Sequence, residues 1–130
     1  MGMTTVHARV LNPADISRES EVEFIIDSGA VYSVIPRTVL EALGIAPHSR
    51  RRFHLADGRA IEREMGFALF DYLGERTGTS VIFGEEGDAA LMGVTTLEGF
   101  GFIFDPIRRE LRPMVLRLFH HCPPCRASTL

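Results

Sequence analysis

One stretch of the sequence combines residue types that could perform chemistry, an acidic side chain and a hydroxyl in an apolar setting. An acidic residue stands between two apolar runs, in the order Phe24–Ile26, Asp27, Ser28, Gly29, Ala30. The β-branched and aromatic residues before Asp27 favour a strand. Asp-Ser-Gly is typical of a tight turn, because its glycine is free to adopt positive φ. The pattern therefore predicts a carboxylate on a short loop between two buried segments.

Such an aspartate has two interpretations. It can be a turn residue that accepts a hydrogen bond from its own backbone. It can also be a reactive group, because burial raises the free energy of a carboxylate and a charge between core segments is therefore unusual.

The rest of the chain predicts short strands and two helices. Pro36 and Gly44 suit the two ends of a helix over residues 37–43, and Thr95 with Glu98 fits a capping box for a helix over 95–100. We expect a loop over 12–20, a turn marked by Gly74 and Gly78, and strands over 6–11, 22–26, 50–56, 59–72, 79–83, 89–93, 102–104 and 110–113. Residues 114–119 are predicted to form a strand or a partner-binding segment.

The Asp57-Gly58 pair predicts a hairpin. Extended runs lie on both sides of this two-residue link, which is a strong hairpin signal. The hairpin can be a plain surface feature or a functional one.

Composition limits the function classes. With 130 residues and a net charge of −3, the chain predicts one domain and no nucleic-acid or membrane partner. No apolar run approaches 18 residues, and no signal peptide is visible. Both cysteines, Cys122 and Cys125, lie near the end of the chain, which agrees with a reducing compartment and a cytoplasmic location.

A metal or cofactor is not expected. The Cys-x-x-Cys pair with His120 and His121 suggests zinc or redox chemistry, but its two prolines favour a flexible tail over residues 119–130, after a domain at 1–118. His48 and His54 lack partners at ligand spacing, and the neighbouring basic cluster, Arg50–Arg52, is typical of a solvated strand entrance.

Three short motifs together resemble the retropepsin-like aspartic proteases. The stretch Ile25–Ala30, followed by Ser33–Ile35, is similar to their active-site loop, and Leu91–Gly93 is similar to the apolar-apolar-Gly element beside it. Leu55–Arg59 resembles the flap of the cellular and prokaryotic members. The order of these elements over residues 6–113 is that of the family.

The resemblance implies a fold and a set of roles. The fold is mostly β, a small closed or partly closed barrel with one or two short helices and one lobe per chain. Asp27 is the implied catalytic residue, and Ser28, Gly29 and Ala30 complete its loop, with Ser28 bonding across a dimer axis. The implied flap residues are Leu55, Ala56, Asp57, Gly58, Arg59 and Ala60, and the loop supports are Leu91, Met92 and Gly93.

Only one such motif occurs, although aspartic-protease chemistry needs two carboxylates sharing one proton. The resemblance therefore implies a homodimer that pairs Asp27 with Asp27, hydrolyses polypeptides, and has a bell-shaped pH–rate profile on the acid side of neutrality. Val6–Leu11 and Met114–Phe119 are candidate interface segments. The alternatives are a catalytically idle dimer that binds peptides, and a small β-barrel unrelated to proteases.

Two departures from the family pattern are visible. Ser28 replaces the commoner threonine, so the hydroxyl is kept and a methyl is lost. Val31 and Val94 stand where retroviral members have an ion pair, and we interpret this as an apolar contact in its place.

Overall fold

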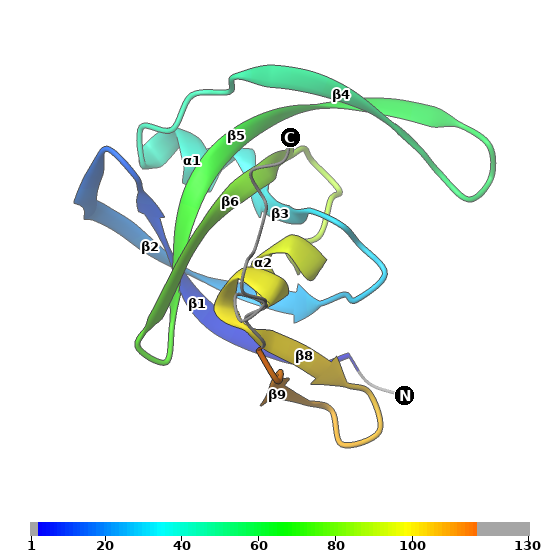
Figure 1. Ribbon diagram of the computed structural model, residues 1–130. Helices are drawn as coiled ribbons and strands as arrows, with labels where there is room; N and C mark the ends of the chain where they lie inside the picture. Colours follow the sequence, from blue (N-terminus) through cyan, green and yellow to red (C-terminus); the bar gives the residue numbers. More distant parts are fainter. Residues whose placement is uncertain (1–2, 117–130) are drawn as a thin grey trace, which may run out of the picture.

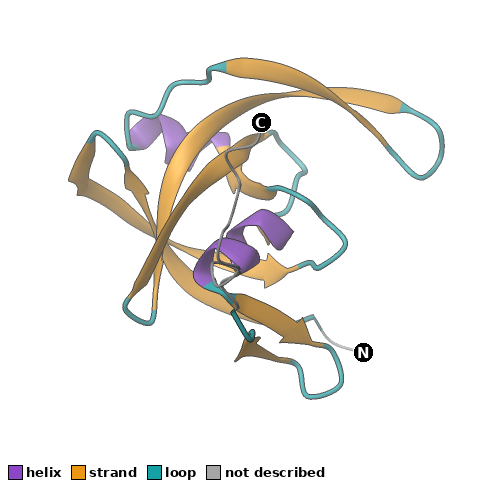
Figure 2. Ribbon diagram, viewed as in Figure 1, coloured by secondary structure: helices purple, strands orange, loops and turns teal. Residues whose placement is uncertain are grey.

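The computed structural model describes residues 3–116, which are mostly strand with two short helices (Figure 2). The strands are β1 (Thr5–Asn12), β2 (Asp15–Ile26), β3 (Ser33–Pro36), β4 (Ser49–His54), β5 (Ala60–Tyr72), β6 (Glu75–Gly84), β7 (Leu91–Met92), β8 (Phe102–Asp105) and β9 (Glu110–Pro113). The helices are α1 (Arg37–Ala42) and α2 (Val94–Phe100). Neither is long and apolar enough to cross a membrane.

Seven strands form one sheet that closes on itself. Their order is β1-β2-β7-β3-β6-β5-β4, and a further pairing of β1 with β5 joins the sheet into a ring. β4 stays outside this ring, paired only with β5, so the β4–β5 hairpin extends from the body as a long arm (Figure 1). β8 and β9 form a separate two-stranded sheet.

The core lies inside the ring because alternate side chains of each strand point inward. Phe24, Phe70 and Phe83 are fully buried and come from β2, β5 and β6. The Phe24 and Phe70 ring centroids are 5.7 Å apart, at a spacing typical of favourable aromatic pairs. The helices add Leu40 and Leu97 to the same cluster. The predicted mostly β fold with short helices is therefore confirmed.

The predicted loop over residues 12–20 is wrong. Only the start of this segment turns, and β2 begins at Asp15. Its polar half pairs antiparallel with β1, so that Glu19 lies opposite Leu11 and Ser20 opposite Val10. Strand formation here follows from backbone pairing along a hairpin, which apolar periodicity does not report.

The predicted turn at Gly78 is also wrong. The turn after β5 uses Leu73 and Gly74, which both have positive φ, whereas Gly78 lies inside β6. A Cβ on Gly78 would lie 2.8 Å from Leu69 Cδ2 and 3.0 Å from the Phe67 ring. Gly78 therefore makes room for side chains of the neighbouring strand rather than for a turn.

The two helices lie where the sequence predicted, but one cap differs. Gly44 follows α1 with a φ of 80°, as expected of a C-terminal glycine. In α2 the N-cap is Gly93, and no side chain caps the helix, so the capping box of Thr95 and Glu98 is wrong. Backbone carbonyls take over this role, as described below.

Two further predictions concern the segments near the ends of the described chain. On β1, Ala8, Val10 and Leu11 are buried, and β5 pairs with residues 9–11 on the edge opposite β2. Val6 is partly exposed, and the interface on Val6–Leu11 stays a prediction. Residues 114–116 form no strand, and 117–119 lie outside the described residues, as do Cys122, Cys125, His120 and His121.

Candidate active site

The loop after β2 carries Asp27 and is held from beneath by β7. β7 lies between β2 and β3 in the sheet and pairs parallel with β2, with Ile25 opposite Leu91 and Ile26 opposite Met92. The Asp27 N–H donates to the Met92 carbonyl at 3.0 Å. The Leu91-Met92 pair therefore supports the start of this loop.

Asp27 is partly exposed, and its carboxylate accepts one hydrogen bond. Its Oδ1 accepts from the Gly29 N–H at 2.9 Å, and the Ala30 N–H donates to the Asp27 carbonyl at 3.1 Å. Gly29 does not have the positive φ expected of it. A Cβ on Gly29 would lie 3.3 Å from Asp27 Oδ1, so glycine permits this close approach. Within residues 3–116, no group donates to Asp27 Oδ2.

Gly93 packs directly under the loop. A Cβ there would lie 2.6 Å from the Tyr32 carbonyl oxygen and 2.9 Å from that of Ala30, and neither backbone atom can move without distorting the loop. The Gly93 N–H donates to Ser33 Oγ at 2.9 Å. Only glycine fits this position.

Beneath Gly93, a buried hydroxyl pair links β3 to α2. Ser33 Oγ lies 2.6 Å from Thr96 Oγ1, and both residues are fully buried. Sequence reasoning missed Thr96. The signal available was a threonine three residues after Gly93, which is uninformative until α2 is known to start at Val94.

The loop also caps α2. The Val94 N–H donates to the Ala30 carbonyl at 2.8 Å, and the Thr95 N–H donates to the Val31 carbonyl at 2.9 Å. The first N–H groups of a helix have no partner within it, so these carbonyls replace the expected side-chain cap. Backbone hydrogen bonds therefore join the segments that carry Val31 and Val94, and the apolar contact between these two side chains stays a prediction.

An apolar groove runs from the loop to the β4–β5 hairpin. One hollow, of about 590 Å³, is lined by Gly29, Ala30, Val31, Tyr32, Val34, Phe53, His54 and Ile82. An adjoining hollow of about 450 Å³ shares four of these residues and adds Leu55, Ile61, Arg63, Gly87, Asp88, Ala89 and Leu91. The hairpin thus forms one wall of the groove and the Asp27 loop another.

The predicted hairpin is confirmed, with a longer connection than Asp57-Gly58 alone. The Leu55 N–H donates to the Arg59 carbonyl at 2.8 Å, and Gly58 adopts a φ of 90°. Asp57 accepts from the Arg59 N–H at 2.9 Å and from Arg59 Nε at 2.7 Å, which lowers the pKa of the Asp57 carboxyl. Ala56 and Ala60 are exposed at this tip. Of residues 55–60, Leu55 is the one that lines the groove.

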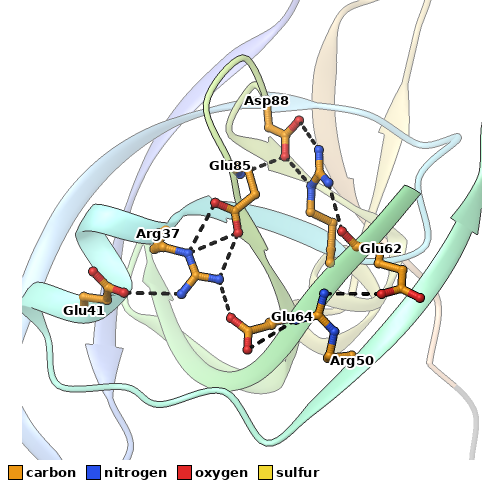
Figure 3. Close-up of polar contacts among 8 residues, drawn as sticks. Arg37, Glu41, Arg50, Glu62, Glu64, Glu85 and Asp88 are labelled. Atoms are coloured by element: carbon orange, nitrogen blue, oxygen red, sulfur yellow. Dashed lines mark hydrogen bonds and ion pairs between the residues drawn. The ribbon is translucent and has the colours of Figure 1, made fainter. Parts of the chain in front are cut away.

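Ion pairs hold the base of the hairpin against the body (Figure 3). Arg63 of β5 binds both oxygens of Asp88, at 2.8 and 3.1 Å, and lowers the pKa of that carboxyl. Arg37 of α1 bonds Glu85 at 2.9 Å and also contacts Glu64 of β5. These contacts join α1, β5 and the segment between β6 and β7.

No metal centre is formed in the part of the chain that the structure describes. Among residues 3–116, no three His, Cys, Asp or Glu side chains gather closely enough to hold an ion.

The comparisons with known proteins agree with this geometry. A model of the aspartyl protease family matches residues 12–95. No curated protein matches the chain significantly. The foamy viral protease–reverse transcriptase, solved with an RNA/DNA hybrid, is 14% identical with a TM-score of 0.55, and the match covers 89% of this chain but 13% of the viral one.

A retropepsin-like aspartic protease from Rickettsia conorii is 20% identical with a TM-score of 0.49, over 85% of this chain and 88% of that one. At such identity the viral match bears on fold alone, and it agrees with the ring of strands described above. The family match includes Asp27, the hairpin and Leu91–Gly93. The chain belongs to the aspartyl protease family, as its motifs predicted.

Proposed function

We propose that the protein is an aspartic endopeptidase that works as a homodimer, with Asp27 of each subunit forming the catalytic pair. The observation that carries this proposal is the position of Asp27. Its carboxylate stands on a loop beside an apolar groove, and Oδ2 accepts no hydrogen bond within residues 3–116. A carboxylate that served only the turn would need no such groove.

The chemistry requires a second carboxylate. Two aspartates about 3 Å apart cannot both ionise, so the pair holds one proton. The ionised member takes a proton from water, and the protonated member donates a hydrogen bond to the peptide carbonyl. The described residues contain one Asp-Ser-Gly loop, so a second copy of the chain supplies the partner.

The surface beside the loop suits a second copy. A hollow of about 210 Å³ starts at Ser28 and is lined mostly by apolar residues of α2, β8 and the segment after β9, among them Leu97, Phe104 and Met114, and also by Glu98. Ile103 on β8 is 49% exposed. A subunit docked there by a two-fold axis would bring its own Ser28 and Asp27 to the same place.

The remaining residues have supporting roles. Gly29 and Ala30 line the groove, and Leu91, Met92 and Gly93 hold the loop in place. The hairpin tip, from Leu55 to Ala60, closes over bound peptide, and the domain spans residues 1–118 with a tail at 119–130.

Replacing Asp27 by asparagine tests the proposal. An amide neither accepts nor donates the proton, so we expect Asp27→Asn to lower turnover of a peptide library by at least about a hundredfold. Asp15→Asn, at the exposed start of β2, is the matched control and should retain activity. Equal turnover by Asp27→Asn would refute the assignment. Peptide binding by both proteins without cleavage would instead identify an idle binding module.

The pH profile tests the shared proton. Because activity needs one proton on the pair, the rate should be bell-shaped and centred below neutrality. A profile that stays flat into the alkaline range, or inhibition by a chelator, would contradict this mechanism.

A further inference from the structure

The three consecutive arginines of β4 do not share a face. In the β4–β5 register, Arg50 lies opposite Glu64, Arg51 opposite Arg63 and Arg52 opposite Glu62. Arg50 and Arg52 form ion pairs with Glu62 at 3.3 and 3.5 Å. Because side chains alternate along a strand, Arg51 points to the other face of the hairpin.

That other face is the wall of the groove. Phe53 lies two residues after Arg51, opposite Ile61, and Phe53, Ile61 and Arg63 all line the groove. Arg51 Nη1 donates to the Tyr32 hydroxyl at 2.9 Å, and its guanidinium lies 5.5 Å from the centre of the Tyr32 ring. The Tyr32 and Phe53 rings meet edge to face at 6.4 Å. Arg51 is thus held at the Tyr32 end of the groove.

The two arginines on this face, Arg51 and Arg63, differ in their ion pairs. Like charges directly opposite each other in a hairpin are unfavourable, and Asp88 neutralises Arg63 through both of its oxygens. No carboxylate within residues 3–116 forms an ion pair with Arg51. A guanidinium has five N–H donors, and one of them is directed at Tyr32, so Arg51 can still bind a carboxylate with two parallel hydrogen bonds.

We propose that Arg51 is a specificity residue that selects peptides with an aspartate or glutamate beside an apolar residue. The apolar side chain occupies the hollow lined by Val34, Phe53 and Ile82, and the carboxylate reaches the guanidinium on Tyr32. This inference rests on the proposed function, because it takes the groove as the peptide-binding site.

Paired peptides test the selection. Ten-residue peptides with randomised apolar residues carry one glutamate in one pool and one glutamine in the matched pool. We expect the protein to favour the glutamate pool in kcat/KM by about tenfold, the size of a charge-assisted pair at a partly exposed site. Arg51→Gln should bring the ratio to about one, and Arg51→Lys should keep part of it because it retains the charge.

Arg52→Gln is the matched control, because it removes the same charge from the adjacent position on the opposite face. It should leave the ratio unchanged. If Arg51 only fastened the hairpin to Tyr32, Arg51→Gln would slow both pools equally and keep their ratio. That result, or a ratio of one in the unmodified protein, would overturn the inference.

A binding measurement separates this inference from the proposed function. Fluorescence polarisation with labelled pools and the Asp27→Asn variant reports selection without turnover. Preference for the glutamate pool that disappears in Asp27→Asn/Arg51→Gln supports the role of Arg51 even if the unmodified protein cleaves nothing. Equal binding of the two pools contradicts it even if cleavage occurs.

Discussion

The Asp27 loop depends on single residues whose small size or hydroxyl group cannot be replaced. Gly93 meets two backbone carbonyls at distances that exclude a methyl group, and Ser33 joins it to Thr96. The sequence predicted Gly93 through its apolar-apolar-Gly motif. The Ser33–Thr96 contact could not be predicted, because it joins residues 63 positions apart.

Gly93→Ala should distort the loop. The added methyl would press on the Tyr32 and Ala30 carbonyl oxygens, so we expect a loss of about 2 kcal/mol in the free energy of unfolding, together with reduced activity. Chemical denaturation and peptide cleavage measure the two effects. Gly74→Ala is the control, because its Cβ meets no atom within 4 Å and only its φ of 83° is strained. Gly74→Ala should lower the free energy of unfolding by about 1 kcal/mol and leave the activity unchanged. Equal effects of the two substitutions would show that contact with the two carbonyl oxygens is not the cause.

At the level of elements, the sequence predicts a local turn more readily than the pairing of one strand with another. The β4–β5 hairpin was predictable because Asp57-Gly58 is a local turn signal. The polar half of β2 was not, because its pairing with β1 leaves no apolar periodicity. The cap of α2 could not be predicted for a similar reason, because the first N–H groups of the helix donate to carbonyls of the Asp27 loop, which is distant in the sequence.

Asp71 fastens the elements that close the ring, and its effect should depend on pH. Its buried carboxylate on β5 accepts from Arg76 of β6 at 2.6 Å and from Arg9 of β1 at 2.6 Å. Arg76 first, and Arg9 as well, lower the pKa of Asp71. A lowered pKa stabilises the folded state above the ordinary value near 4, and this stabilisation is lost as pH falls through the folded value.

Asp71→Asn should therefore cost about 2 kcal/mol of unfolding free energy at neutral pH. The difference between the two proteins should stay constant above about pH 5 and shrink below pH 4. Urea denaturation across this range measures it. A difference that persists unchanged at the lowest pH would mean that shape, rather than charge, stabilises the site.

At the scale of the whole molecule, the proposed function requires two copies of the chain to associate beside the Asp27 loop. Ile103 is exposed on β8, beside the apolar hollow that begins at Ser28. Ile103→Glu would place a charge in the proposed interface, so we expect the monomer–dimer dissociation constant to rise at least about tenfold. Sedimentation over a concentration series gives this constant.

Ile16→Glu is the control for that measurement. Ile16 is 51% exposed but lies at the turn end of the β1–β2 hairpin, which is away from β8 (Figure 1). The control should not alter association. A chain that sediments as a strict monomer while it cleaves peptides would contradict the proposed pairing of Asp27.

The position of β7 has a consequence for the biosynthesis of the protein. β7 lies between β2 and β3, yet the ribosome makes it long after both, and Gly93 follows its hydroxyl partner Ser33 by 60 positions. Until Met92 and Gly93 leave the ribosome, the Asp27 N–H has no Met92 carbonyl to donate to, and Gly93 does not yet pack under the loop. Contacts so distant along the chain form late in folding. A nascent chain therefore cannot complete the loop that carries Asp27 until Gly93 has left the ribosome.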